Sequence, residues 1–467
     1  MSDLLEQLRK AVGESHVLVG DAIHPDYTHD ETLTLTPVVP RALVQPGSTD
    51  EVSEVLRIAT EHRVPVIARG SGTGLSGAAF PVADGILLAF DRMNRIREID
   101  TENQVAVVEP GVTLEQLNAA LRPLGLIYPV SPGEQTASLG GNVGTNAGGM
   151  RAVRYGVTRQ HVLGLEVVLA DGRVLRTGGK FVKSSTGYDL TQLLVGSEGT
   201  LAVTTEVTVK VQPRLTETTT VLVPFATLAE VTHAVPRIVA SGVNPTILEY
   251  ADALVLGSIT RSAGLDLGIP EEVQERAQAY LIVVLEEPSE SRLDEDVEQL
   301  GTLLGDLGAI DVYVLPPQAG ASLITARERL FFVSKAAGCD DIIDAVIPRA
   351  AIPDYLAKVA EVAAAHETFV SGCGHVGDGN VHLAVFQPDA EKRKQLTHEI
   401  FRIAVDAGGA VSGEHGLGTE KMPYFLEMAD PTAVELMRAI KKDFDPLGIL
   451  GPDRVLGVGE TGTGATS

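Results

Sequence analysis

The sequence predicts an α+β protein with more than one domain. Strands and capped helices alternate along the first third of the chain, and a strand–helix–strand pattern occurs twice in the second half. The doubled pattern is typical of a ferredoxin-like sheet. The length of 467 residues exceeds what a single hydrophobic core normally serves, so at least two cores are expected.

The elements of the first half follow from apolar runs and capping signals. Ser48 with Glu51, and Thr113 with Gln116, form capping boxes that open two helices. Residues 131–149 are rich in Gly, Asn, Ser and Thr, so we expect a long ordered loop there, a feature usually tied to function. Strands are predicted over 41–45, 64–68, 86–90 and 105–108, a hairpin over 162–175, and a period-2 strand over 200–211.

The two strand–helix–strand units begin after Pro213, where we place a domain boundary. Strands 220–224 and 246–250 flank helix 228–240, and strands 280–285 and 310–315 flank helix 292–307. A helix over 353–365, strands over 368–371 and 380–386, and a last helix over 432–442 follow.

The composition excludes several classes of function. With 37 Lys and Arg against 62 Asp and Glu, the net charge of −25 disfavours nucleic acid and anionic lipid as partners. The two cysteines, Cys339 and Cys373, exclude a disulfide scaffold and are expected to be small buried fillers. No apolar run approaches the roughly 20 residues of a membrane span, and the N-terminus lacks a secretory signal. We expect a cytoplasmic protein and leave peripheral attachment at the inner membrane open.

The segment RGSGTGLSG at residues 69–77 follows a predicted strand. Residues 72–77 match the dinucleotide fingerprint G-x-G-x-x-G, and Asp91 lies 19 residues beyond Gly72. The fingerprint requires a helix directly afterwards, whereas Pro81 and Gly85 leave no room for one. The loop is therefore predicted to cradle a phosphate with backbone N–H groups, and a tight hairpin is the alternative.

Two further glycine-rich segments strengthen the prediction of a cofactor. The glycines of residues 131–149 let the backbone approach a flat ligand, and Asn142, Thr145 and Asn146 supply hydrogen bonds. Residues 196–203, GSEGTLAV, combine a tight turn with a strand. A glycine-rich sheet rim is the alternative, but three such loops in one domain favour a large cofactor.

Histidines and a glutamate gather in two segments, GHVGDGNVH (374–382) and GEHGLG (413–418). A turn between His375 and His382 would bring two imidazoles to one point, and Glu414 adds a carboxylate. This donor set suits Zn²⁺, Mn²⁺ or Fe²⁺, with coordination positions left for a substrate. Buried, hydrogen-bonded histidines in a tight turn are the alternative.

The motifs PRALVQP, RGSGTGLSG, GGNVGTNAGG and VGSEGTLAV, in this order, resemble the FAD-binding domain of the vanillyl-alcohol-oxidase (PCMH-type) flavoprotein superfamily. The C-terminal half resembles its D-2-hydroxyacid dehydrogenase branch, which includes D-lactate, D-2-hydroxyglutarate and glycolate dehydrogenases. The resemblance implies a PCMH-type FAD-binding domain of two subdomains, a ferredoxin-like cap domain with an antiparallel sheet, and a C-terminal helical segment. The implied division is an N-terminal helical segment (1–35), the FAD-binding domain (36–215), the cap with the metal site (216–430), a segment returning to the FAD-binding domain (431–456) and a disordered tail (457–467).

The same resemblance implies roles for individual residues. FAD would bind non-covalently, because a threonine occupies the place of the flavin-linking histidine of many relatives. A divalent metal, Zn or Mn, would be held by His375, His382 and Glu414, and His415 would act as the base. Arg327 would hold the substrate carboxylate; a helix-surface arginine paired with its neighbour Glu328 is the alternative. The residues implied to bind FAD are Arg69, Gly70, Ser71, Gly72, Thr73, Gly74, Pro132, Thr136, Ser138, Gly141, Thr145, Glu198, Gly199 and Val203.

The reaction implied is oxidation of a D-2-hydroxy acid to the 2-keto acid, with hydride transfer to flavin N5. Relatives that act on D-2-hydroxyglutarate carry polar residues where Phe331, Ile342 and Ala384 stand here, which favours a short or apolar acid such as D-lactate. Alternatives are a D-2-hydroxyglutarate or glycolate dehydrogenase, a non-catalytic FAD subunit of a glycolate oxidase-type complex, and a metal-only hydrolase. A quinone, a cytochrome, an electron-transferring flavoprotein or O₂ is expected to accept the electrons, and a homodimer is compatible with the sequence.

Overall fold

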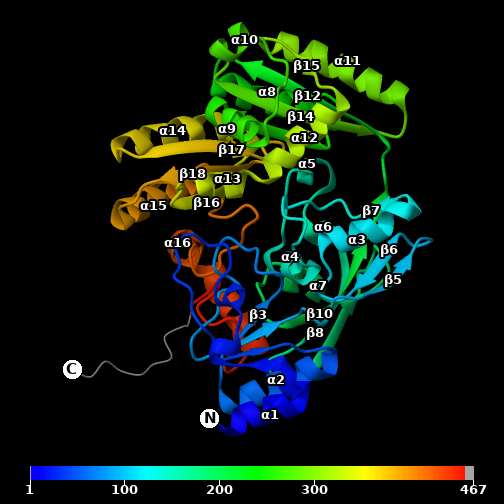
Figure 1. Cartoon of the computed structure of the whole chain (residues 1–467), viewed down its shortest axis with the longest axis vertical. Coiled ribbons are helices and arrows are strands. Elements are labelled where there is room, and N and C mark those ends of the chain that lie inside the picture. Colours follow the sequence, from blue (N-terminus) through cyan, green and yellow to red (C-terminus); the bar gives the residue numbers. More distant parts are fainter. Residues whose placement is uncertain (1, 458–467) are drawn as a thin grey trace.

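The computed structural model describes residues 2–457, which form two lobes (Figure 1). The N-terminal part, blue to cyan, and the red C-terminal end form the lower lobe, and the green-to-orange part forms the upper lobe. The α+β class predicted from the sequence is confirmed, because each lobe combines helices with at least one sheet.

Two sheets of different character form the lower lobe. The first has the order β1-β2-β4-β3, in which β2, β4 and β3 run parallel and β1 is antiparallel to β2. The second is antiparallel, with the order β5-β6-β10-β8-β9. The strands, including the small pair β7 and β11, are β1 (Val17–Leu18), β2 (Ala42–Val44), β3 (Val66–Arg69), β4 (Ile86–Ala89), β5 (Ile96–Asp100), β6 (Val105–Val108), β7 (Leu126–Ile127), β8 (Val162–Val168), β9 (Val174–Gly178), β10 (Val203–Lys210) and β11 (Gln212–Pro213).

One of the glycine-rich segments of the lower lobe contains a helix, and another does not. As predicted, residues 70–85 between β3 and β4 contain no helix. Residues 131–149, expected to be a loop, contain α4, so that expectation was wrong for this part. Leu139 and Val143 of α4 are buried against the antiparallel sheet, and this packing outweighs the low helix propensity of its glycines. The helices are α1 (Ser2–Val12), α2 (Thr49–His62), α3 (Leu114–Leu121), α4 (Leu139–Thr145), α5 (Ala152–Tyr155), α6 (Thr158–His161) and α7 (Leu190–Leu194).

The upper lobe is built on a seven-stranded antiparallel sheet with the order β15-β12-β14-β13-β17-β18-β16. The first four strands have the order of the predicted ferredoxin-like unit, and three later strands extend it. The strands are β12 (Glu217–Phe225), β13 (Ile247–Asp252), β14 (Ala279–Glu287), β15 (Tyr313–Val314), β16 (Asp341–Val346), β17 (Phe369–Gly374) and β18 (Asn380–Phe386).

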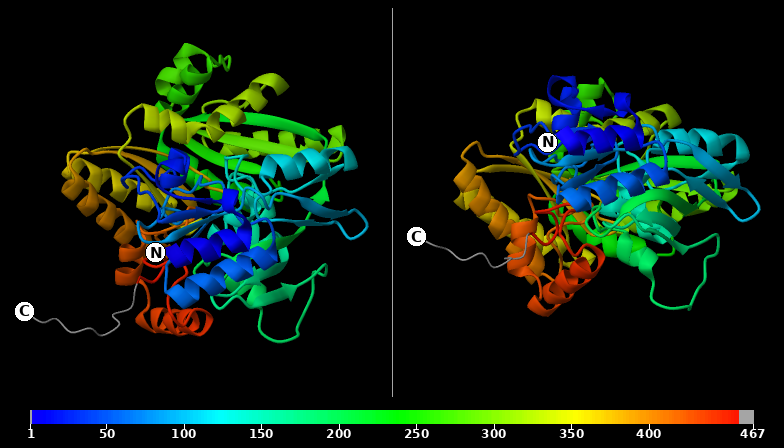
Figure 2. Two further views of the ribbon diagram at one scale, coloured as in Figure 1. Left: turned by 60° about the horizontal axis from the view of Figure 1, so that its bottom comes forward. Right: turned by 90° about the horizontal axis from the view of Figure 1, so that it is seen from below.

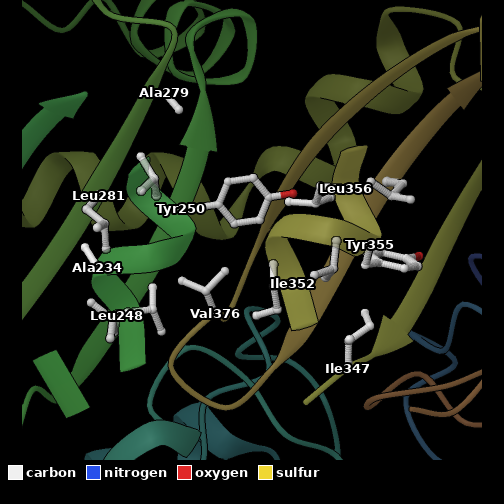
Figure 3. Close-up of a cluster of buried hydrophobic side chains, with 14 of the residues drawn as sticks. Ala234, Leu248, Tyr250, Ala279, Leu281, Ile347, Ile352, Tyr355, Leu356 and Val376 are labelled. Carbon is white, nitrogen blue, oxygen red and sulfur yellow. The ribbon is translucent and has the colours of Figure 1, made fainter. Parts of the chain in front are cut away.

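Helices cover both faces of this sheet, and the two faces have separate cores. Tyr250 and Tyr355 are fully buried in the core that α8 and α14 cover (Figure 3). β18 contributes Val381, Leu383 and Val385 to this core, so His382 and Ala384 point to the opposite face, where the candidate site lies. The helices are α8 (Leu228–Ala240), α9 (Ala253–Ala263), α10 (Glu271–Arg276), α11 (Glu290–Asp306), α12 (Pro317–Glu328), α13 (Leu330–Ala336), α14 (Ile352–Ala365) and α15 (Ala390–Asp406).

The chain finally returns to the lower lobe through α16 (Met422–Met428) and α17 (Pro431–Phe444). Leu450 forms a parallel bridge with Val66 of β3, and Figure 2 shows this red segment beside the blue N-terminal elements. The predicted disordered tail, apart from its first residue, lies outside the described residues. Within residues 2–457, no helix has both the length and the apolar composition needed to cross a bilayer.

Candidate active site

The three glycine-rich segments meet around one cavity in the lower lobe. Its walls come from the loop after β3, from α4 and its flanks, and from the turn that precedes β10. The predicted cofactor residues that line it are Gly70, Ser71, Gly72, Thr73, Gly74, Pro132, Ser138, Gly141, Thr145, Glu198, Gly199 and Val203.

The local structure of this cavity fits a large flat cofactor. A Cβ on Gly70 would lie 2.1 Å from Ser138 Oγ and 3.4 Å from the Gly141 backbone, so the close approach of the two segments leaves no room for a side chain at residue 70. Asn142 lines the cavity, and its Nδ2 is buried without a hydrogen-bond partner among the described residues. A ring carbonyl of a flavin would satisfy such a donor.

Two of the predicted cofactor residues do not line the cavity. The Arg69 guanidinium donates hydrogen bonds to the carbonyls of Asp26 (2.7 Å) and His29 (2.6 Å), and so ties the N-terminal segment to β3. The carbonyl of Thr136 accepts a hydrogen bond from the Ser71 hydroxyl at 2.6 Å. The Thr136 hydroxyl itself donates to Glu134 Oε1 at 2.7 Å, and neither Arg69 nor Thr136 is among the residues that line the cavity.

Glu198 lines the cavity but also joins the two lobes. Its carboxylate accepts hydrogen bonds from the N–H groups of Leu417 (2.7 Å) and Gly418 (2.8 Å), and burial raises its pKa. The glutamate thereby fixes the segment that carries Glu414 and His415 beside the cofactor cavity.

His375, His382 and Glu414 converge on one point. The turn between the two histidines brings their imidazoles together, as expected from the sequence, and Glu414 joins them from a distant segment. Glu414 Oε1 lies 3.1 Å from His375 Nε2 and 3.2 Å from His382 Nε2. Two ligand atoms bound to one ion at about 2.1 Å lie roughly 3.0–3.4 Å apart in tetrahedral or octahedral geometry. Both distances from Glu414 fall in this range, and all three ligand atoms lie within 4.8 Å of one another, so the donor set fits a divalent transition metal.

A second layer of charged groups holds this cluster. Glu249, fully buried on β13, binds His375 Nδ1, and its Oε2 lies 2.8 Å from Arg327 Nη2. A carboxylate on the far nitrogen of a histidine is typical of metal sites. Arg327 is 7% exposed, so the alternative of a surface arginine paired with Glu328 was wrong. Its Nε is buried and has no hydrogen-bond partner among the described residues.

Asp344 of β16 organises the loop that carries Glu414 and His415. Its Oδ2 accepts hydrogen bonds from the Ser412 hydroxyl (2.8 Å), the backbone N–H groups of residues 413–415 (3.0–3.2 Å) and Lys421 Nζ (3.2 Å). Its Oδ1 accepts one from Asn380 Nδ2 at 2.6 Å. Burial raises the pKa of Asp344, but Lys421 and the nearby histidines outweigh burial and hold the pKa well below its ordinary value.

His415 stacks on His382, with ring centroids 5.1 Å apart and an interplanar angle of 12°. Burial lowers its pKa to about 4, so the imidazole is neutral at pH 7 and can accept a proton. Burial also opposes the charged forms of His375 and Glu414. The carboxylates nevertheless raise the pKa of His375, and the histidines lower the pKa of Glu414. A proton and a divalent cation would therefore compete for the same position.

Sequence reasoning missed Glu249 and Asp344, although both leave a signal. Each is a carboxylate in the interior of a short, mostly apolar strand, ILEYAD or DIIDAV, whose other acidic residue stands at the strand end. A buried carboxylate is costly unless it is paired, so an acidic residue in a central strand indicates a partner. The partners come from distant segments, which a single sequence does not reveal.

Comparison with known proteins identifies the class of the chain. Residues 40–178 match the family described as FAD binding domain, and residues 214–455 match FAD linked oxidases, C-terminal domain. The fold resembles the crystal structure of p-cresol methylhydroxylase with substrate bound, with a TM-score of 0.80 at 20% identity over 98% of this chain and 96% of that chain. The chain belongs to the FAD-linked oxidase family and has its PCMH-type fold.

Individual relatives match nearly end to end. An uncharacterized FAD-linked oxidoreductase of Mycobacterium tuberculosis (strain ATCC 25618 / H37Rv) is 52% identical over 98% of this chain and 100% of its own. A D-lactate dehydrogenase of Archaeoglobus fulgidus is 38% identical over 92% and 95%, and glycolate oxidase subunit GlcD of Bacillus subtilis is 36% identical over 97% and 96%. The predicted resemblance to the D-2-hydroxyacid branch is thereby confirmed.

Proposed function

We propose that this FAD-linked oxidoreductase uses a divalent metal to oxidise a D-2-hydroxy acid to the 2-keto acid. One observation carries the proposal: the cofactor cavity and a second cavity share a wall. That wall includes Leu75, Pro132, Glu414 and His415, and the second cavity also contains Arg327. A substrate there would lie between the flavin position and the metal-binding cluster.

Each group of site residues would have a separate role in the reaction. Bound FAD would accept a hydride from the substrate carbon, and a metal held by His375, His382 and Glu414 would lower the pKa of the substrate hydroxyl. His415 would take the hydroxyl proton, because its imidazole is neutral and its Nδ1 has no hydrogen-bond partner among the described residues. Arg327 would hold the carboxylate and so fix which face of the substrate meets the flavin.

D-lactate is the first substrate to test, because the relative from Archaeoglobus fulgidus is named D-lactate dehydrogenase. Apolar residues also stand here at the positions where relatives that act on D-2-hydroxyglutarate carry polar ones. Phe331, Ile342 and Ala384 all line the second cavity. Glycolate follows from the relative named glycolate oxidase subunit. Electrons would leave the flavin for a quinone, a cytochrome or an electron-transferring flavoprotein.

Anaerobic stopped-flow spectroscopy tests the proposal. The FAD-loaded protein would be mixed with D-lactate, L-lactate, glycolate or D-2-hydroxyglutarate, and bleaching of the flavin band would be followed. We expect D-lactate to reduce the flavin at least 100-fold faster than L-lactate. If none of these acids bleaches the flavin, the assigned substrate class is wrong.

The role of His415 has a matched control. His415→Asn should slow flavin reduction by about 10²–10⁴-fold, the usual contribution of a general base. His398 lies on α15, where its Nε2 contacts Glu427 at the surface, and His398→Asn should leave the rate unchanged. Equal rates for wild type and the His415 variant would remove this histidine from the mechanism.

A further inference from the structure

The second cavity is larger than lactate needs. Its volume is about 360 Å³, within the range of roughly 300–1,000 Å³ typical of ligand pockets. Arg327, His375, His382, Glu414 and His415 line one end of the cavity, and its other polar lining residues are Ser258, Glu328, Ser334 and Ser371. Among the described residues, Arg327 is the only Lys or Arg in its lining.

The strand register shows which side chains line the cavity with increasing distance from His375, His382 and Glu414. β16, β17 and β18 are antiparallel neighbours, so residues paired across them face the same side of the sheet. From the metal-binding end outward, the paired side chains that line the cavity are Cys373 and His382, then Ile342, Ala384 and Ser371, then Phe369 and Phe386. His382 and Phe386 are four residues apart, or about 13 Å at ~3.3 Å per residue.

The opposite wall is also mostly apolar. α9 contributes Leu254, Val255 and one serine, Ser258. α13 contributes Leu330, Phe331, Val333 and one serine, Ser334. Ser371, the polar residue of the middle pair, donates its hydroxyl to Asp252 at 3.0 Å and is thus already satisfied. Phe369 and Leu254 are 51% and 58% exposed, so the apolar groove opens to solvent at its outer end.

From this layout, and building on the proposed function, we infer that the preferred substrate is a D-2-hydroxy acid with a long aliphatic or aryl-alkyl substituent. The carboxylate and hydroxyl occupy the metal end, and the substituent extends past Ala384 toward Phe386. The methyl group of lactate is too short to reach the two outer sets of paired side chains, which are Ile342, Ala384 and Ser371, and then Phe369 and Phe386. A second carboxylate would meet Ile342 and Phe331 instead of a cation, and burying it unpaired is costly.

A chain-length series tests the inference on the protein loaded with FAD and metal. D-lactate, D-2-hydroxybutanoate, D-2-hydroxyhexanoate and D-2-hydroxyoctanoate would be compared by kcat/KM, and pyruvate and 2-oxooctanoate by calorimetric Kd. We expect kcat/KM to rise about fourfold per added CH₂, equivalent to ~0.8 kcal/mol of apolar transfer, and 2-oxooctanoate to bind at least 50-fold more tightly than pyruvate.

Two substitutions locate the effect in this groove. Ala384→Leu fills the middle of the groove, so the ratio of kcat/KM for D-2-hydroxyoctanoate over D-lactate should fall at least tenfold. Phe331→Ala removes part of the opposite wall and should lower the same ratio severalfold, which covers the case in which the leucine variant misfolds. Phe332, adjacent in sequence, 48% exposed and outside the lining, is the control, and Phe332→Ala should leave the ratio unchanged.

The outcomes separate this inference from the proposed function. A flat or falling series, with D-lactate still reducing the flavin, overturns the inference and leaves the proposed function standing. If no hydroxy acid reduces the flavin and neither keto acid binds, both are overturned. A ratio that is unaffected by Ala384→Leu in a folded variant also contradicts the assignment of the groove.

Discussion

Asp344→Asn is the substitution for which the structure predicts the sharpest local effect. The carboxylate is fully buried and accepts hydrogen bonds from the backbone of residues 413–415 and from Lys421. An amide keeps the shape of the side chain but removes its charge. It also turns an NH₂ group toward Asn380 Nδ2, a donor that now bonds to Asp344 Oδ1. Leaving Lys421 buried without its countercharge costs about 3–5 kcal/mol.

Hydrogen exchange measures this effect directly. A local loss of 3–5 kcal/mol should speed exchange of the amides of residues 413–415 by roughly two to four orders of magnitude, and metal affinity should fall with it. Asp445 is a matched control in the other lobe, since it accepts N–H bonds from Ile449 (3.1 Å) and Leu450 (2.7 Å) and pairs with Lys441. Asp445→Asn should leave residues 413–415 protected. Wild-type protection and metal affinity in Asp344→Asn would refute the reasoning.

Three further substitutions give separate checks. Glu249→Gln removes the negative charge beside His375 Nδ1 and should lower metal affinity 10–100-fold in a calorimetric titration. An unchanged Kd for the metal would show that Glu249 does not assist His375 as a ligand. Arg69→Met removes two hydrogen bonds to backbone carbonyls, so the free energy of unfolding should fall by about 1–3 kcal/mol and residues 24–31 should become sensitive to proteolysis. Unchanged resistance to proteolysis would contradict this prediction. Ile342→Lys places a cation in the groove and should raise the ratio of kcat/KM for D-2-hydroxyglutarate over D-2-hydroxyhexanoate at least tenfold; no change would show that this position is remote from the substituent.

Much of the fold could be predicted because its elements carry local signals. The strand at residues 380–386 and the helix at 228–240 have the predicted bounds, since an apolar run or a capping box marks their ends. α4 was missed because its stability comes from burial of Leu139 and Val143 rather than from its glycine-rich sequence. Tertiary packing outweighed propensity there.

Some residues of the site could likewise be predicted from local sequence, and others could not. His375 and His382 could be paired from sequence because a short turn separates them, and Glu414 stands in a recognisable glycine-rich segment. Glu249 and Asp344 come from other strands of the same sheet, and their roles depend on a strand order that no local pattern encodes. The burial of Arg327 depends on Glu249 in turn, which is why local spacing favoured a surface ion pair instead.

Removal and return of the metal test the central claim most directly. The protein would be treated with a chelator, its flavin absorbance checked, and its anaerobic reduction by the best D-2-hydroxy acid timed before and after adding Zn²⁺ or Mn²⁺. The account predicts that the flavin stays bound, that reduction slows by at least 100-fold without metal, and that one of the two ions restores it. Reduction of the metal-free protein at the original rate would contradict a metal role for His375, His382 and Glu414.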